Sequence, residues 1–310
     1  MKKIAPTRRT FLVSASLAAI GTALRPALAA ALPRSMSAKA SGPRFQKLPA
    51  AFAQLEKDNG GRLGVSVLDT GSRETVGHRS GERFAMCSTF KMLLAASVLS
   101  RADADKESLD RAIAIPASGF LGNSPITKEH AGGKMTLRDL CQAVITRSDN
   151  TAANLLLDTI SGPQGITEFA RRLGDTVTRL DRTEMSLNEA KPGDPRDTTS
   201  PEAMVTNWQK LLLGNFLSEP SRKQLTAWLI ATTTGRERLR AGFHANWTAG
   251  DKTGSNGENT SNDVAIAWPD NQPPVIVAAY LTECPGPEDK REAVLAEVGR
   301  LVAKSIAPAA

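Results

Sequence analysis

Residues 247–283 decide the fold, and they read WTAGDKTGSNGENTSNDVAIAWPDNQPPVIVAAYLTE. Three segments of this stretch are strand-like, with turn residues between them: 247–255, 263–270 and 273–283. A helix is expected after Pro287, because apolar residues recur there at helical spacing. The end of the chain therefore predicts three strands followed by a helix.

A helix and two strands are also expected near the start of the chain. Apolar residues within 45–55 recur at helical spacing, and Gly60 and Gly61 form a good helix stop. In RLGVSVLDTGS, residues 62–72, apolar residues alternate as in a strand, and the turn at 69–72 leads into a second strand.

Strands at both ends and a mainly helical middle predict an α/β fold with two lobes. The first lobe, residues 44–87 and 231–310, is expected to hold an antiparallel sheet built from both chain ends and flanked by helices. The second lobe, residues 88–230, is expected to be an inserted, all-helical lobe. An active site should lie between the two lobes.

The first 43 residues are expected to be an export signal and a loose lead-in. Residues 11–24 are uncharged but shorter than the about 20 apolar residues that a membrane span needs. Small residues at Ala27 and Ala29 fit a cleavage signal, so residues 1–29 are predicted to be removed and 30–43 to form the lead-in. The stretch Thr7 to Leu12 (TRRTFL) resembles a twin-arginine signal, and an uncleaved anchor is the alternative.

The net charge of +7 belongs to the leader and the lead-in rather than to the folded domain. Nine basic residues and no acidic residue precede residue 48, so the rest of the chain is slightly acidic. Nucleic-acid binding needs a basic patch on the folded domain, and none is therefore expected.

The three cysteines, Cys87, Cys141 and Cys284, cannot all pair with one another. The sequence has no C-x-x-C motif, and its three histidines are scattered. A zinc site of clustered ligands is therefore not expected, and the sequence predicts no metal and no cofactor.

Three short motifs point to one kind of chemistry. Within MCSTFK, residues 86–91, Ser88 and Lys91 lie three positions apart, so they share one face of a helix. The tripeptide Ser-Asp-Asn occupies 148–150 between two helical runs, and Lys-Thr-Gly occupies 252–254 in a predicted strand. Each motif alone can arise by chance, but together and in this order they are the signature of class A β-lactamases and penicillin-binding proteins.

On these motifs, nearly all of the chain after the leader resembles a class A serine β-lactamase. A fourth stretch strengthens the resemblance, because family members carry a loop whose glutamate and asparagine hold a hydrolytic water. Glu184 and Asn188 match those two residues, and Arg182 and Asp197 match the ion pair that closes the neck of the loop. Residues 182–197 are thus expected to form an Ω-loop. A solvated surface loop with ordinary charges is the alternative.

The resemblance implies a role for each residue of the acylation step. Ser88 is the expected nucleophile, and the first turn of a buried helix favours the negative charge that develops there. The backbone N–H groups of Ser88 and Ser255 are expected to form the oxyanion hole, and Ser148 to carry a proton to the leaving ring nitrogen. The base stays open: it is either Lys91, neutralised by burial and by nearby Lys252, or Glu184 acting through water.

The resemblance also implies the residues that bind the substrate. Asn150 is expected to bond the side-chain amide of the substrate, and Gly254 lets backbone and substrate approach closely. The substrate carboxylate is expected to contact four side chains: Lys252, Thr253, Ser255 and Arg238. An ordinary surface position is the alternative for Arg238, since other arginines flank it.

Two departures from the family pattern concern the surroundings of these residues. Met185 stands where many members have a proline in a cis peptide bond. The partner positions of the disulfides found in some members are not cysteines here, so no intramolecular disulfide is expected from Cys87 or Cys141.

The expected function is hydrolysis of β-lactam antibiotics in the periplasm, without a cofactor and by a monomer that does not bind the membrane after signal cleavage. A D-alanyl-D-alanine carboxypeptidase and a β-lactam sensor that stays acylated are the alternatives. Both use similar serine–lysine chemistry without the pair formed by Glu184 and Asn188, and that pair favours the hydrolase.

Overall fold

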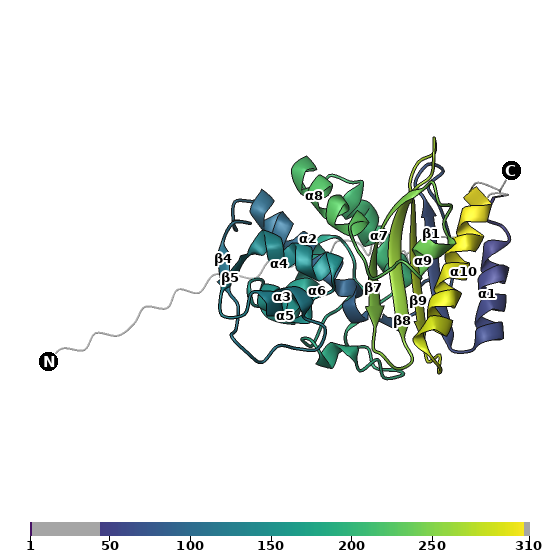
Figure 1. Cartoon of the computed structure of the whole chain (residues 1–310). Helices are drawn as coiled ribbons and strands as arrows, with labels where there is room; N and C mark the ends of the chain where they lie inside the picture. Colours follow the sequence, from purple (N-terminus) through teal and green to yellow (C-terminus); the bar gives the residue numbers. More distant parts are fainter. Residues whose placement is uncertain (2–43, 307–310) are drawn as a thin grey trace. The chain divides into compact units, whose positions relative to one another are not determined.

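The computed structural model describes Met1 and residues 44–306 (Figure 1). The expectations for the leader and for the lead-in up to residue 43 lie outside the described residues. No helix in the part that is described is long and apolar enough to cross a membrane.

The main sheet has five strands in the order β2-β1-β9-β8-β7, and every neighbouring pair is antiparallel. Its strands are β1 (Arg62–Asp69), β2 (Glu74–His78), β7 (Thr248–Ser255), β8 (Ser261–Trp268) and β9 (Val275–Thr282). The first and last parts of the chain meet where β1 pairs with β9, with Val65 opposite Ala279. The prediction of one antiparallel sheet built from both chain ends is confirmed.

Helices cover both faces of this sheet (Figure 1). On one face lie α1 (Leu48–Asn59) and α10 (Glu288–Ile306), and on the other α7 (Pro201–Leu212) and α8 (Glu219–Ile230). All eight residues of β9 are buried, because alternate side chains enter two different cores. Tyr280 joins the core around α2 (Phe90–Asp103), whereas Val277 packs in the core beneath α10.

Helix α2 is the centre of the second lobe. All its residues from Phe90 to Ser100 are buried, because α4 (Leu137–Thr146), α5 (Asn150–Asp158), α6 (Gly162–Arg172) and α8 pack around it. A helix surrounded in this way needs apolar residues on all sides, and the sequence supplies them around a single lysine, Lys91.

The insertion is not all-helical, and that prediction is wrong in detail. The strands β4 (Ala112–Ala114) and β5 (Lys134–Thr136) pair with each other, with Ile113 opposite Met135. These strands are three residues long, too short to leave a period in the sequence. The remaining elements of the described chain are β3 (Phe84–Ala85), η1 (Cys87–Thr89), α3 (Pro125–Glu129), η2 (Ser186–Asn188), β6 (Thr198–Thr199) and α9 (Leu239–Gly242).

Candidate active site

Ser88 and Lys91 meet where the short helix η1 leads into α2. Lys91 Nζ donates a hydrogen bond to Ser88 Oγ over 3.0 Å. Lys91 is fully buried, whereas Ser88 is partly exposed. A reactive hydroxyl thus lies at the surface of the site with a buried amine directly behind it.

The Lys91 ammonium is surrounded by oxygen atoms from two other segments. Nζ lies 2.9 Å from the carbonyl oxygen and 3.3 Å from Oγ of Ser148, 2.5 Å from Asn150 Oδ1, and 2.9 Å from Glu184 Oε1. Burial lowers the pKa of Lys91, and the Glu184 carboxylate opposes that effect. Proton transfer from Lys91 to Glu184 therefore needs no movement of either group.

In the segment 148–150, the side chains of Ser148 and Asn150 face Lys91, whereas the side chain of Asp149 stabilises the local structure. Asp149 caps the N-terminus of α5 by accepting from the Ala152 N–H, and it accepts further bonds from Thr127. Ser148 has a positive φ of 55°. Asn150 is held from its other side, because Nδ2 donates to the Gly122 carbonyl over 2.6 Å.

Lys252 brings a second cation to the Ser148 hydroxyl. It extends from β7, and its Nζ lies 3.1 Å from Ser148 Oγ and 3.0 Å from the Thr253 carbonyl oxygen. Burial, followed by the nearby charge of Lys91, lowers the pKa of Lys252 to about 7. The Ser148 hydroxyl lies between two lysines whose pKa values are both lowered.

Gly254 lets β7 approach η1 more closely than another residue could. A Cβ atom at this position would lie 2.6 Å from the Met86 carbonyl oxygen and 3.2 Å from the Ser88 nitrogen. Asn262 on β8 braces the same place, since its Nδ2 donates to the carbonyls of Ala85 and Met86. The edge of the sheet is thereby fixed beside the Ser88 backbone.

Glu184 reaches the site from the loop at residues 182–197. Its Oε1 lies 3.4 Å from Ser88 Oγ, and its Oε2 accepts a 2.7 Å hydrogen bond from Asn188 Nδ2. Asn154 on α5 holds the Glu184 backbone at both ends, because Nδ2 donates to the Glu184 carbonyl and Oδ1 accepts from the Glu184 N–H, each over 3.0 Å. The peptide bond between Glu184 and Met185 is cis.

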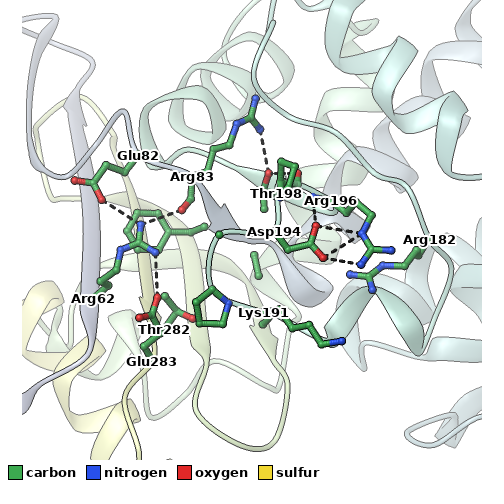
Figure 2. Close-up of a pocket in the computed structure, with 16 residues that line it drawn as sticks. Arg62, Glu82, Arg83, Arg182, Lys191, Asp194, Arg196, Thr198, Thr282 and Glu283 are labelled. Carbon is green, nitrogen blue, oxygen red and sulfur yellow. Dashed lines mark hydrogen bonds and ion pairs between the residues drawn. The ribbon is translucent and has the colours of Figure 1, made fainter.

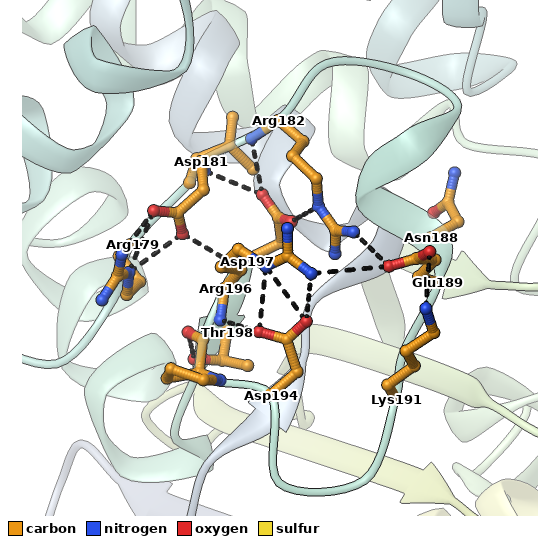
Figure 3. A network of polar contacts seen from close by, with 12 residues as sticks. Arg179, Asp181, Arg182, Asn188, Glu189, Lys191, Asp194, Arg196, Asp197 and Thr198 are labelled. Atoms are coloured by element: carbon orange, nitrogen blue, oxygen red, sulfur yellow. Dashed lines mark hydrogen bonds and ion pairs between the residues drawn. The ribbon is translucent and has the colours of Figure 1, made fainter.

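Ion pairs close the neck of the loop, as Figure 3 shows. Arg182 Nε lies 2.6 Å from Asp197 Oδ2, and the buried Asp197 also accepts from the N–H groups of Asp181 and Arg182. Arg182 Nη1 bonds Glu189 in the middle of the loop over 2.5 Å. Because these contacts join both ends of the loop to its centre, they hold the segment that carries Glu184.

A pocket of about 570 Å³ lies against the second half of the loop, between residues 190–196, β3 and the end of β9 (Figure 2). Ser88 and Lys91 are not among the described residues that line it. Two of its cations are paired with carboxylates: Arg62 contacts Glu82 and Glu283, and Figure 2 shows the guanidinium of Arg196 turned to Asp194. Arg83 instead donates to the Val177 carbonyl and the Thr198 hydroxyl. The pocket is therefore separate from the cluster around Ser88 and Lys91.

Arg238 lies against β7, but its guanidinium binds other groups than those expected for a contact with the substrate carboxylate. It is 4% exposed, and its Nη1 donates to the carbonyl oxygens of Gly254 (3.0 Å) and Asn262 (2.9 Å). Glu288 and Glu292 of α10 bind the rest of the guanidinium. These contacts do not favour the predicted binding of a substrate carboxylate by Arg238.

The remaining predicted binding residues lie along β7. Thr253 is buried, and its hydroxyl lies 2.7 Å from that of Thr234. Ser255 is partly exposed at the end of the strand, and its Oγ accepts from the Gly257 N–H. Together with Lys252, these side chains form a polar edge next to Ser88.

Sequence reasoning missed Asn154 and Asn262. Asn154 is an isolated polar residue in an apolar segment, whereas Asn262 lies in the polar run 259–263, and neither pattern reveals a buried hydrogen bond before its partner is known. Cys87, Cys141 and Cys284 are buried free thiols. Burial raises the pKa of the Cys87 thiol to about 12. Among the residues that the structure describes, no cluster of histidine, cysteine or acidic side chains could hold a metal ion.

Comparisons with known proteins agree on one family. A model of the "Beta-lactamase enzyme family" matches residues 47–306. β-Lactamase L2 of Stenotrophomonas maltophilia is 46% identical over 302 residues, covering 96% of this chain and 99% of that protein. β-Lactamase Toho-1 of Escherichia coli is 45% identical over 248 residues, covering 80% and 85%.

Solved structures give the same result. A β-lactamase from Xanthomonas campestris pv. campestris has a TM-score of 0.83 and 46% identity, and the match covers 85% of this chain and 99% of that one. An ancestral class A β-lactamase of Gram-negative bacteria has a TM-score of 0.82 and 55% identity, with 83% and 99% covered.

Proposed function

The chain belongs to the class A serine β-lactamases, and from this premise we propose that it hydrolyses the β-lactam ring of penicillin- and cephalosporin-type antibiotics through a serine acyl-enzyme. The position of Glu184 carries the proposal: Oε1 lies 3.4 Å from Ser88 Oγ, and Oε2 is held by Asn188. A carboxylate so close to the reactive hydroxyl can activate water against the ester that forms there. Hydrolysis of the ring gives the cell resistance to the antibiotic.

Acylation begins when Ser88 Oγ attacks the lactam carbonyl carbon. The Ser88 proton passes to Lys91 Nζ, which lies 3.0 Å away. Burial lowers the pKa of Lys91 and so favours the neutral amine that this step needs, and Glu184 Oε1 is close enough, at 2.9 Å, to accept the proton that Lys91 gives up. We thus assign the acylation base to Lys91, which is nearer to Ser88 Oγ than Glu184 is.

Opening of the ring breaks the bond between the carbonyl carbon and the ring nitrogen, which then takes up a proton. Ser148 supplies that proton from its hydroxyl and receives one from Lys91 over 3.3 Å. The net result is the transfer of one proton from Ser88 to the ring nitrogen. Lys91 is then neutral and can take back its own proton from Glu184. Glu184 is again a carboxylate before the second half of the reaction.

In deacylation, Glu184 acts as the base that activates water against the ester. Glu184 takes a proton from a water whose oxygen attacks the ester carbon, and Asn188 orients the catalytic carboxylate. The bond from that carbon to Ser88 Oγ then breaks, and the proton returns to Ser88. The N–H groups of Ser88 and Ser255 stabilise the negative oxygen in both halves of the reaction.

Substrate binding is assigned to the polar edge of β7 and to Asn150. Lys252, Thr253 and Ser255 bind the carboxylate of the antibiotic, and the close approach at Gly254 brings them next to Ser88. Asn150 bonds the side-chain amide of the substrate. These assignments come from the family resemblance and are supported by the position of the side chains around Lys91.

A chromogenic cephalosporin tests the proposal. The purified mature protein is expected to turn over many equivalents, and Ser88→Ala is expected to lose covalent labelling by penicillin. Glu184→Ala is expected to accumulate the acyl-enzyme, seen by intact mass. A single stoichiometric burst from the unaltered protein would identify a sensor instead. Hydrolysis of a D-alanyl-D-alanine peptide, with penicillin acting only as an inhibitor, would identify a carboxypeptidase.

The leader motif supports a further proposal, that the folded enzyme is exported to the periplasm by the twin-arginine pathway. We also propose that it acts there as a monomer. Replacing Arg8 and Arg9 together by lysine is expected to keep the activity in the cytoplasmic fraction. Equal activity in the periplasmic fraction of the variant would reject this route. Light scattering of the purified protein measures the oligomeric state.

A further inference from the structure

The contacts of Arg238 bear on the peptide between Gly254 and Ser255. Arg238 Nη1 donates to the Gly254 carbonyl oxygen over 3.0 Å. That carbonyl and the N–H of Ser255 belong to the same peptide unit, which is planar and points its two ends in opposite directions. The arginine therefore holds one end of the peptide whose other end is assigned to the oxyanion hole.

A charged donor at the carbonyl has two physical effects. Hydrogen bonds with an ionised partner are stronger than neutral ones, so the orientation of the peptide plane is fixed. Hydrogen bonds along a chain also polarise one another, so electron density drawn to the Gly254 oxygen makes the Ser255 N–H a better donor. Both effects act on the negative oxygen of the tetrahedral intermediate.

The surroundings of Arg238 suit this task. Its second bond from Nη1, to the carbonyl of Asn262, joins the paired residue on the neighbouring strand. Glu288 lies 2.8 Å from Nη2 and Glu292 lies 3.2 Å from Nε, so the buried charge is compensated from α10. Arg238 is 4% exposed as a whole residue, so its guanidinium is held against the strand β7.

We propose that Arg238 is a positioning residue that orients and polarises the Gly254–Ser255 peptide of the oxyanion hole, rather than a ligand of the substrate carboxylate. This inference rests on the proposed acyl-enzyme mechanism. It predicts that loss of Arg238 slows acylation and deacylation alike, and that the substrate carboxylate has no influence on the size of the loss.

The kinetic test compares a chromogenic cephalosporin with its methyl ester, which lacks the carboxylate. Arg238→Ala is expected to lower kcat/KM about 10-fold with both substrates, less than the 10²–10³-fold loss that follows removal of a whole oxyanion donor. A loss seen mainly in KM and only with the free carboxylate would overturn the proposal and restore Arg238 as a substrate ligand. Equal rates for the variant and the unaltered protein would overturn it as well.

A spectroscopic test separates positioning from general damage to the fold. In the Glu184→Ala background the acyl-enzyme accumulates, and infrared difference spectra report how strongly its ester carbonyl is polarised. Arg238→Ala is expected to shift this band to higher wavenumber, and Arg238→Lys, which keeps the charge, to shift it less. An unchanged band in both variants would refute the proposal. If the alanine variant does not fold, the lysine variant alone decides, by a partial shift or none.

The two proposals fail in different ways. If the unaltered protein does not turn over the cephalosporin, the proposed function is wrong. If it does turn over the drug while the Arg238 variants keep their rates and their carbonyl band, only the role of Arg238 is wrong.

Discussion

Replacing Asn154 by alanine removes the contacts that hold the Glu184 backbone. The side chain makes two hydrogen bonds of 3.0 Å, one to the carbonyl and one from the N–H of Glu184, and Glu184 itself is buried. Each bond is worth about 1 kcal/mol net, and groups left unpaired in a buried place add to the loss. We expect a loss of roughly 2–3 kcal/mol in the free energy of unfolding, which lowers Tm by about 4–10 °C for a domain of this size.

The same change is expected to act mainly on deacylation. Misplacing a catalytic group by about 1 Å costs on the order of 10²-fold in rate. The Glu184 carboxylate would drift from the ester, whereas Ser88 and Lys91 keep their own contact on α2. Acylation should slow less, because in that step Glu184 only holds the proton of Lys91 and does not act on the reacting carbon. Stopped-flow measurement of acylation, together with intact-mass decay of the acyl-enzyme, separates the two steps.

Asp158→Ala provides the matched control for Asn154→Ala, because Asp158 is exposed at the other end of the same helix. It is expected to change neither Tm by more than about 1 °C nor either rate, as is usual for a surface substitution. A lowered Tm in Asn154→Ala with unchanged deacylation would refute the reasoning, since the clamp would then serve stability alone. Equal losses in acylation and deacylation would refute it too.

Three further predictions follow from burial and close contact. Burial and the charge of Lys91 lower the pKa of Lys252 to about 7, so the positive charge of Lys252 is lost as the pH rises above that value. KM for a carboxylate-bearing substrate should therefore rise above pH 7 in the unaltered protein but stay level in Lys252→Arg. A parallel rise in both proteins would contradict this. Gly254→Ala places a Cβ 2.6 Å from the Met86 carbonyl oxygen, so we expect a destabilisation of about 1–3 kcal/mol and a lower kcat/KM. Thermal unfolding and steady-state kinetics measure these two effects. Full activity at an unchanged Tm would contradict the prediction. Cys87 is fully buried, and burial raises the pKa of its thiol to about 12. The thiol should therefore resist a thiol reagent in the folded enzyme and react after denaturation. Rapid labelling of the folded enzyme, located to Cys87 by peptide mapping, would contradict this prediction.

Local patterns were sufficient to predict the sheet and the contact between Ser88 and Lys91. Alternating apolar residues mark β1, and long apolar runs mark β8 and β9, whatever their partners are. Ser88 and Lys91 lie three residues apart on one helix, so their contact is local as well. The short pair β4 and β5 escaped prediction because three residues hold no readable period.

The tertiary structure alone decided what each polar group contacts. The sequence placed Arg238 near Lys252 but did not show that Glu288 and Glu292, fifty or more residues later on α10, would compensate its charge. It did not show that Asn154 on α5 would bind the backbone of Glu184 in the loop. The lowered pKa values of Lys91 and Lys252 depend on complete burial, which arises only when remote segments enclose them. Periodicity and short motifs are properties of neighbouring residues, whereas burial and hydrogen bonding depend on distant segments that the fold brings together. For this reason the sequence predicted the residues of this site but not the balance of charge around them.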